Sequence, residues 1–312
     1  GLRTKGYFKF SYKKVDDKWF ICDFYGNIIK EAPEDIQKKI KEYAKSLNKD
    51  QNINELPLIT VITVVLNGAK TLEETIQSVI NQTYPNVEYI IIDGGSTDGT
   101  LDIIKKYENY IDYWISERDK GIYDGMNKGV EIANGKWINF MNAGDIFSTK
   151  KVLKESLKIF TINDIAIIYS DMIVKFGDYG VLKRAYNISK INYFMPFQHQ
   201  CSFTKSSIIK ECKFDTNFKL ASDYNLFLLQ YQKGGKFYYL NRPIAEVSSG
   251  GISDSQRNLV RKEYYSIQKK NNVATFKNRM YYYHFQNLEY IKKITKFILP
   301  NFIIKYIRKT LG

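Results

Sequence analysis

Residues 89–100 read YIIIDGGSTDGT, and this stretch decides how the chain around it folds. Three isoleucines lead into a cluster of glycine, serine and aspartate, and Leu101, Ile104 and Tyr107 then recur at the spacing of one helix face. This order predicts a buried strand, a tight loop and a helix. Because ligands bind at the carboxyl ends of the strands in an open parallel sheet, the loop predicts a binding site at that edge.

The loop also carries groups that can bind a ligand. Its glycines let the backbone approach a flat ligand, and Asp93, Ser96 and Asp98 supply acceptors and a hydroxyl for a base or a ribose. No lysine follows the glycines as in a P-loop, and the G-x-G-x-x-G spacing of a dinucleotide site is absent. For this stretch alone, a structural alternative stays open, in which Asp98 caps the helix and the glycines only turn the chain.

Strands and helices alternate on both sides of this loop. A continuous apolar strand is predicted at Ile59–Leu66, and further strands at Ile111–Ser116 and Trp137–Met141 enclose a helix at Ile122–Ala133. This alternation predicts a mostly parallel sheet with right-handed crossovers, flanked by helices. Beyond Asp145 the pattern changes to a mixed order of helices, strands and a hairpin.

The two ends of the chain read differently from this α/β core. Residues 1–56 predict an aromatic hairpin, a helix that begins at Pro33 and a polar linker, and we expect this appendage to pack against the main domain. Residues 57–254 form the predicted main domain. Residues 255–312 predict a helical, basic C-terminal region.

Composition limits the classes of partner. The formal net charge of +14 comes chiefly from lysine and favours anionic partners such as nucleotide diphosphates, anionic lipid surfaces or nucleic acid. No recognisable reader motif supports nucleic acid, so we do not expect it as a partner. Three cysteines without C-x-x-C spacing indicate neither a disulfide framework nor a zinc site, which favours a reducing compartment. No apolar run approaches the ~20 residues that span a bilayer and no signal peptide is recognised, so a cytoplasmic location is expected.

Four stretches of this sequence, in order, resemble successive motifs of the family 2 glycosyltransferases. They are VITVVLN at 61–67, IDGGSTDGT at 92–100, DKGIYDGMNKG at 119–129 and FMNAGD at 140–145. The resemblance spans roughly Leu58 to Ser253 and implies a GT-A-like fold. It also implies an inverting, metal-dependent hexosyl- or N-acetylhexosaminyltransferase, which moves a sugar from a nucleotide diphosphate, foremost a UDP-sugar, to a glycan or lipid-linked glycan of the cell surface. The alternative is a non-catalytic nucleotide-sugar binding protein on the same fold.

The resemblance also implies which residues hold the nucleotide. They follow the first, second and third strands of the predicted sheet or lie at their ends, and they are Val64, Asn67, Asp93, Ser96, Asp119 and Lys120. Among them, the lysine is also placed to meet a phosphate.

The metal motif of the family is usually Asp-x-Asp or Asp-x-Asp-Asp just past the fourth strand, and this chain departs from it. Asn142-Ala143-Gly144-Asp145 keeps only the last carboxylate. We expect Asp145 to bind Mg²⁺ or Mn²⁺, with the amide oxygen of Asn142 as a weaker ligand, because these cations prefer hard oxygen ligands. The alternative is that Asp145 only caps a helix that follows it.

Asp223 is the predicted catalytic base. It stands at the start of a predicted helix where the family typically shows Glu-Asp, with Ser222 in place of the glutamate. Inversion requires a base that takes the proton of the acceptor hydroxyl. A helix-capping role for Asp223 is the alternative. By resemblance, His199 and Gln200 lie on the acceptor side.

The end of the chain predicts contact with a membrane surface. Residues 291–312 carry six basic and no acidic residues, with apolar stripes that are broken at Pro300. A basic amphipathic segment of this kind lies in the membrane interface rather than spanning it. We therefore expect a peripheral location at the cytoplasmic face of the inner membrane. A helix folded back on the main domain is the alternative.

Overall fold

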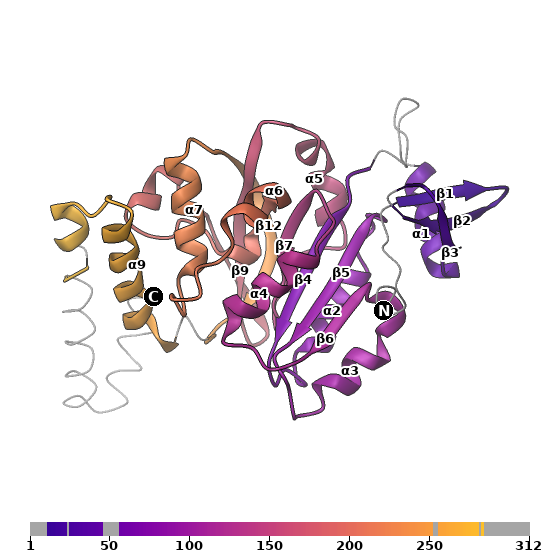
Figure 1. Ribbon diagram of the computed structural model, residues 1–312, viewed down its shortest axis with the longest axis horizontal. Helices are drawn as coiled ribbons and strands as arrows, with labels where there is room; N and C mark the ends of the chain where they lie inside the picture. The colour runs from indigo at the N-terminus through magenta and orange to yellow at the C-terminus, as the bar shows by residue number, and fades with distance from the viewer. Residues whose placement is uncertain (1–10, 24, 46–55, 252–254, 281, 284–312) are drawn as a thin grey trace.

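A computed structural model describes residues 11–23, 25–45, 56–251, 255–280 and 282–283. Within this part of the chain, a three-stranded sheet lies near the N-terminus, and a nine-stranded sheet with helices on both faces forms the main domain (Figure 1).

The first half of the main sheet is parallel, as the alternation of strands and helices predicts. Its strands follow the order β6-β5-β4-β7. These strands are β4 (Ile59–Val65), β5 (Val87–Asp93), β6 (Tyr113–Ser116) and β7 (Trp137–Phe140). The connecting helices are α2 (Leu72–Ile80), α3 (Thr100–Lys106) and α4 (Ile122–Ile132). All seven residues of β4 are buried, because helices cover both faces of the sheet at this strand.

The second half of the sheet is mixed. β11 pairs antiparallel with both β7 and β9, whereas β12 runs parallel to β9 and antiparallel to β8. The strands are β8 (Ile146–Phe147), β9 (Ile165–Phe176), β10 (Tyr179–Lys183), β11 (Ser202–Lys205) and β12 (Lys236–Ser248). The helices are α5 (Val152–Phe160), α6 (Ser206–Cys212) and α7 (Ser222–Gln232), with short 3₁₀ turns η4 (Ile188–Asn192) and η5 (His199–Cys201).

Two apolar layers hold the sheet between its helices. Successive strand residues point to opposite faces, so Ile91 packs in one layer and Ile90 and Ile92 pack in the other. Helices α2, α3 and α5 contribute to the first layer, and α4, α6 and α7 to the second. Helix α4 lies very close to β4, since a Cβ on Gly129 would stand 2.6 Å from Cγ2 of Ile62.

The N-terminal part is a small antiparallel sheet followed by one helix. Strands β1 (Ser11–Val15) and β2 (Lys18–Cys22) form the predicted hairpin, and α1 (Glu34–Lys45) begins directly after Pro33. The structure adds β3 (Ile28–Glu31), a strand of four residues too short to show a pattern in the sequence.

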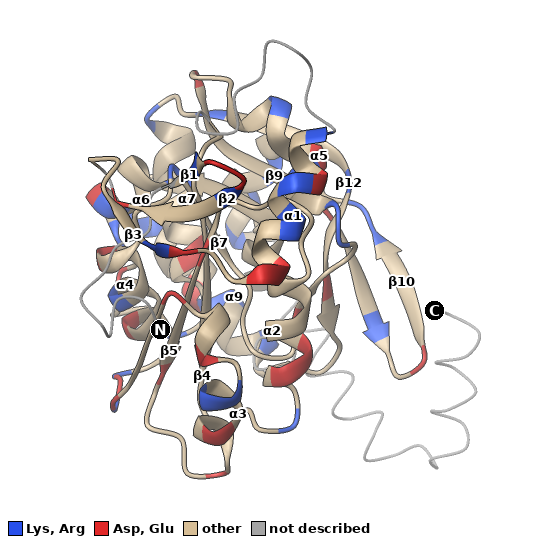
Figure 2. Ribbon diagram, turned by 90° about the vertical axis from the view of Figure 1, so that its right-hand side faces the viewer, with Lys and Arg blue, Asp and Glu red and all other residues tan. Residues whose placement is uncertain are grey.

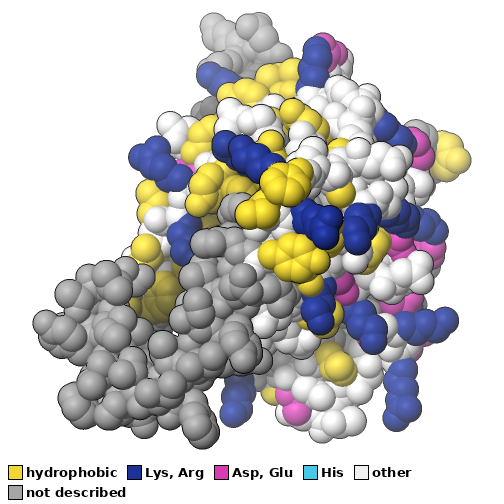
Figure 3. Space-filling view, turned by 90° about the vertical axis from the view of Figure 1, so that its left-hand side faces the viewer, with side chains coloured by type: hydrophobic (Ala, Val, Ile, Leu, Met, Phe, Trp, Pro, Cys, Tyr) yellow, Lys and Arg dark blue, Asp and Glu magenta, His cyan; other side chains and the backbone are white. Residues whose placement is uncertain are grey.

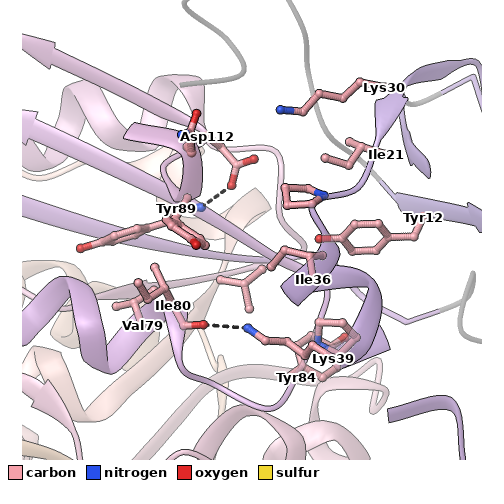
Figure 4. Close-up of a pocket in the computed structure, with 15 residues that line it drawn as sticks. Tyr12, Ile21, Lys30, Ile36, Lys39, Val79, Ile80, Tyr84, Tyr89 and Asp112 are labelled. Carbon is pink, nitrogen blue, oxygen red and sulfur yellow. Dashed lines mark hydrogen bonds between the residues drawn. The ribbon is translucent and has the colours of Figure 1, made fainter. Parts of the chain in front are cut away.

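Helix α1 packs against the main domain near the amino ends of β4 and β5. The ring of Tyr43 meets that of Tyr84 edge to face at 5.7 Å, and Lys39 Nζ donates to the carbonyl oxygen of Ile80 at 2.7 Å. A cavity of about 60 Å³ remains between the two parts, lined by Tyr12 and Ile36 on one side and by residues of the main domain on the other (Figure 4). The N-terminal part is thus attached at the edge opposite the predicted binding loops.

At the other end, α9 (Arg257–Lys270) packs on α7, with the rings of Tyr224 and Tyr264 4.5 Å apart. Residues 291–312, the predicted membrane segment, lie outside the described residues. In the described part of the chain, no helix has both the length and the apolar character needed to cross a bilayer.

Basic and acidic residues are interspersed along the elements that Figure 2 shows.

Candidate active site

Asp93 ends β5 at the carboxyl edge of the sheet and is fully buried. Its Oδ2 accepts hydrogen bonds from the backbone N–H groups of Gly95 (3.1 Å) and Ser96 (2.9 Å) and from Oγ of Ser116 (2.6 Å). Its Oδ1 is buried and has no hydrogen-bond partner within the described residues. The loop therefore holds one carboxylate oxygen firmly, whereas the other is a buried acceptor that calls for an explanation.

The loop after β4 is tied to the loop after β5. The backbone N–H of Asn67 donates to Oγ of Ser96 at 2.7 Å, and Oδ1 of Asn67 accepts from the N–H of Thr97 at 2.9 Å. Asn67 has a φ of 52°, a left-handed conformation that asparagine tolerates. The carboxylate of Asp98 accepts from the N–H of Thr100 and from that of Ala69 in the other loop, and the N-cap position of α3 is Gly99, so Asp98 joins the two loops rather than only capping the helix. Val64 lies beside these loops as the second-last residue of β4.

Asp119 and Lys120 follow β6 on a third loop. Oδ1 of Asp119 accepts from the N–H of Gly121 at 3.0 Å, and its Oδ2 lies so close to Gly94 that a Cβ there would stand 2.6 Å away. Lys120 is exposed, and its backbone N–H donates to Asp124. The structure thus brings the six predicted nucleotide-binding residues to the ends of three neighbouring parallel strands.

The predicted metal and acceptor residues form a second group. Asp145 follows β7, and its Oδ2 accepts from Nε2 of Gln200 at 2.8 Å. Nδ2 of Asn142 lies 3.0 Å from Nε2 of His199. Each predicted metal ligand is therefore hydrogen-bonded to one predicted acceptor residue.

His199 links this group to Asp223. Its Nδ1 lies 3.0 Å from Oδ2 of Asp223. The carboxylate of Asp223 accepts, so Nδ1–H of His199 donates to it, and the Nδ2 group of Asn142 donates, so Nε2 accepts.

Asp223 is the second residue of α7 and is 8% exposed. Its Oδ1 accepts from Oη of Tyr123 at 3.0 Å and from the N–H of Tyr224 at 2.8 Å. The bond to Tyr224 does satisfy one amide of the first helical turn, as a cap would. A capping role alone would not require the hydrogen bonds from Tyr123 of α4 and His199 of η5. Donors from three elements therefore converge on this carboxylate.

Burial sets the electrostatics of the site. It raises the pKa of Asp145 to about 6, although the bond from Gln200 and the nearness of His199 oppose the rise. Burial is the first cause, and the carboxylate of Asp223 the second, that raise the pKa of Tyr123 well above its ordinary value, so this phenol stays a donor.

Strand β8 begins directly after Asp145, which excludes the alternative that Asp145 caps a following helix.

Further acceptor atoms at this edge are buried without a partner within the described residues. Besides Oδ1 of Asp93, they are Oδ1 of Asn142 and Oε1 of Gln200. Among the described residues, no three His, Cys, Asp or Glu side chains gather as a closed metal site requires. The oxygen donors that are present, Asp145 and Oδ1 of Asn142, still fit a hard cation that takes its other ligands from substrate phosphates and water.

A known family model matches the part of the chain that contains most of these residues. The family model described as "Glycosyl transferase family 2" matches residues 60–218, which is half of the chain and includes ten of the eleven predicted site residues, all but Asp223. The chain belongs to glycosyl transferase family 2.

Relatives of this family 2 protein include mycobacterial enzymes. An uncharacterized glycosyltransferase of Mycobacterium tuberculosis is 29% identical over 186 residues, which cover 55% of this chain and 68% of the relative. The PGL/p-HBAD biosynthesis glycosyltransferase of Mycobacterium bovis is 25% identical over 215 residues, with 67% and 82% covered.

Solved structures share the fold. Residues 1–349 of S. aureus TarS in complex with UDP-GlcNAc superpose with a TM-score of 0.56 at 19% identity, covering 67% of this chain and 64% of that one. A mannosyltransferase from Pyrobaculum calidifontis in complex with GDP-Man and Mn²⁺ gives 0.57 at 15% identity, covering 76% and 70%. The chain spans 39% of a longer TarS structure. The predicted GT-A-like α/β fold is confirmed.

Two residues of the site escaped the sequence interpretation. Tyr123 donates to the predicted base, and Ser116 donates to Asp93. The sequence contained a signal for each residue. Tyr123 stands inside the GIYDGMN motif, and Ser116 ends a predicted strand at the binding edge.

Proposed function

We propose that this family 2 protein transfers a sugar, with inversion, from a UDP-sugar to a glycan or lipid-linked glycan acceptor in cell-surface polysaccharide synthesis. One observation carries the proposal: Asp223, held by Tyr123 and His199, belongs to the same hydrogen-bonded network as Asn142, next to the predicted cation ligand Asp145. A base and a diphosphate-neutralising site then lie together, as glycosyl transfer requires.

The donor's nucleotide is proposed to bind at the loops after β4, β5 and β6. The unpartnered Oδ1 of Asp93 would accept the ring N–H of a uracil, and the tied loops of Asn67 and Ser96 would support the ribose. UDP and UDP-GlcNAc are ligands of TarS, which shares this fold. This supports a UDP-sugar of the hexosyl or N-acetylhexosaminyl class.

The residues that would hold Mg²⁺ or Mn²⁺ are Asp145 and Asn142. When bound, such a cation neutralises the negative charge that develops on the leaving diphosphate. Burial disfavours the ionised form of Asp145, so a cation partner would restore its charge. The contact from Asn142 Nδ2 to His199 fixes the amide and leaves its Oδ1 available.

Asp223 is proposed as the general base. It would take the proton of the acceptor hydroxyl while that oxygen bonds the anomeric carbon, and the bond from the anomeric carbon to the diphosphate oxygen would break with its electron pair. Tyr123 and His199 both donate to the carboxylate, which fixes its orientation before the acceptor arrives.

The test of this function is a panel of UDP-, GDP- and CDP-sugars on the full chain. The melting temperature is measured with and without Mn²⁺, and sugar release or transfer is measured on the same samples. We expect UDP-sugars to stabilise the chain most and to be turned over. Stabilisation without turnover, even with glycan acceptors present, would favour the non-catalytic binding protein. No stabilisation by any nucleotide sugar would overturn the proposal.

The division of the chain and its location are also proposals. We propose an N-terminal appendage and linker at 1–56, a catalytic domain at 57–254 and a basic C-terminal region at 255–312, which would hold the protein at the cytoplasmic face of the membrane. The basic composition of residues 291–312 supports this location.

A further inference from the structure

A second pocket lies between α9 and the chain that follows η4. Its volume is about 190 Å³, and its lining residues are Tyr193, Phe194, Arg261, Tyr264, Tyr265, Gln268, Asn278 and Tyr282. An apolar cavity of about 150 Å³ is enough to bind one benzene ring. The pocket is therefore large enough for one six-membered sugar ring.

The pocket is built on buried amides. Nε2 of Gln268 donates to the carbonyl oxygen of Tyr193 at 2.8 Å and to Oη of Tyr224 at 3.1 Å. Nδ2 of Asn278 donates to the carbonyl oxygen of Asn192 at 2.6 Å. Both amide side chains are 3% exposed, so these bonds fix the walls in place before any ligand binds.

The lining is aromatic and basic. Five of the eight lining residues are aromatic, one is an arginine and none is acidic. Lys277 Nζ lies 5.1 Å from the ring centre of Tyr193, and Lys269 Nζ lies 4.5 Å from that of Tyr265. Figure 3 shows the face that carries α9, where hydrophobic and basic side chains lie next to one another. Flat rings fit the C–H faces of a pyranose, and the guanidinium fits a carboxylate or phosphate.

The pocket is adjacent to the predicted base. Tyr264, in its wall, packs its ring 4.5 Å from that of Tyr224, the residue that follows Asp223 in α7. Gln268, also in its wall, donates from Nε2 to Oη of Tyr224 at 3.1 Å, so two lining residues contact the residue next to Asp223. The ligand of this pocket would thus lie on the α7 side of the active site, away from the nucleotide loops of β4, β5 and β6.

We propose that this pocket binds an anionic sugar of the acceptor glycan, one that carries a carboxylate or a phosphate. The aromatic walls would hold the ring, and Arg261 would bind the anionic group. That the sugar belongs to the acceptor rests on the proposed function, whereas binding of an anionic sugar does not.

Binding is tested on the full chain without donor, by calorimetric titration and saturation-transfer NMR. The probes are methyl β-glucuronide, glucose 6-phosphate, the neutral methyl β-glucoside and inorganic phosphate. We expect at least one anionic sugar to bind about tenfold or more tightly than the neutral glycoside and than inorganic phosphate. The anionic sugar that binds more tightly shows whether the pocket prefers a carboxylate or a phosphate. Equal affinity for the neutral glycoside, or for phosphate alone, would overturn the proposal, and this comparison needs no variant.

Arg261→Gln locates the site. It should weaken binding of the preferred anionic sugar by about tenfold or more and leave the neutral glycoside unchanged. Lys262→Gln is the matched control, because it removes the same charge one residue along α9 from a side chain that is exposed and outside the pocket. Equal loss in the two variants would overturn the proposal. UDP binding, measured on the same samples, reports separately on the proposed donor site.

Discussion

Asp223 accepts hydrogen bonds from α4, η5 and its own helix. Its two possible roles, general base and helix cap, can be separated by one substitution. Asp223→Asn keeps an oxygen that can accept from the N–H of Tyr224 but cannot take a proton. We expect a folded variant with parental affinity for UDP and transfer that is ~100-fold to 10,000-fold slower. Donor binding by calorimetry and transfer by product analysis measure this. Asp102→Asn, on the exposed surface of α3, is the control, and near-parental transfer in Asp223→Asn would exclude this base.

The raised pKa of Asp145 makes a prediction about stability. Asp145 has a pKa of about 6 in the folded chain, so it holds its proton up to about that pH, whereas the unfolded chain releases the proton near the ordinary pKa of 3.8. The free energy of unfolding therefore falls as the pH rises through this window. Asp145→Asn cannot ionise, so its stability relative to the parent should rise by on the order of 1–3 kcal/mol between pH 4 and pH 7.

Urea unfolding of both proteins at several pH values, without divalent cations, measures this difference. Asp98→Asn is a useful control, because hydrogen bonds, first that with Thr100, hold the pKa of that carboxyl below its ordinary value of 3.8. Its stability relative to the parent should therefore stay nearly flat between pH 4 and pH 7 and should rise only as the pH falls further, which is the opposite sign. A difference that stays flat with pH for Asp145→Asn would mean that its carboxylate is ionised without cost in the folded chain.

Single residues of this site were predictable where a motif carries them and not where only packing does. Asp93 and Asp145 stand in stretches with a readable pattern. The bonds that join Asp145 to Gln200 and Tyr123 to Asp223 span 55 and 100 residues of sequence, and no local pattern encodes them. The sequence therefore indicates the members of the site but not their network.

At the scale of elements, the loops after β5 and β6 depend on a glycine at their contact. A Cβ on Gly94 would stand 2.6 Å from Oδ2 of Asp119, so Gly94→Ala forces this carboxylate, which also accepts from the N–H of Gly121, to move. We expect a loss of about 1–3 kcal/mol in unfolding free energy and weaker binding of UDP. Gly251→Ala is the control, since no atom of the described residues lies within 4 Å of its Cβ position. Parental UDP affinity in Gly94→Ala would mean that the nucleotide does not use this contact.

The parallel half of the sheet could be predicted because its buried strands are continuous apolar runs that end in polar loops. The mixed half was harder for a physical reason. β9 is one continuous strand of 12 residues, which pairs with β10, β11 and β12. Its sequence therefore contains no break between a separate strand and the first arm of the hairpin that follows. Pairing order in a mixed sheet depends on contacts between distant segments, which periodicity does not report.

At the scale of the whole molecule, the basic segment at 291–312 predicts reversible binding to anionic membranes. Deleting it should abolish co-sedimentation with phosphatidylglycerol liposomes and leave UDP affinity unchanged, because each of its six basic residues contributes on the order of 1 kcal/mol near such a surface. Liposomes of phosphatidylcholine alone are the control. Retention by anionic liposomes after the deletion would mean that another surface of the protein binds them.

The N-terminal part meets the main domain at the amino ends of β4 and β5, and the binding loops lie at their carboxyl ends. β5 has seven residues, so about 20 Å of strand separates the two edges. A chain immobilised on a sensor chip through its N-terminal part would therefore present the proposed nucleotide loops to the flowing solution. The same geometry makes that part a suitable place for a fluorescent label, because a dye on its described strands would stay clear of the proposed nucleotide loops.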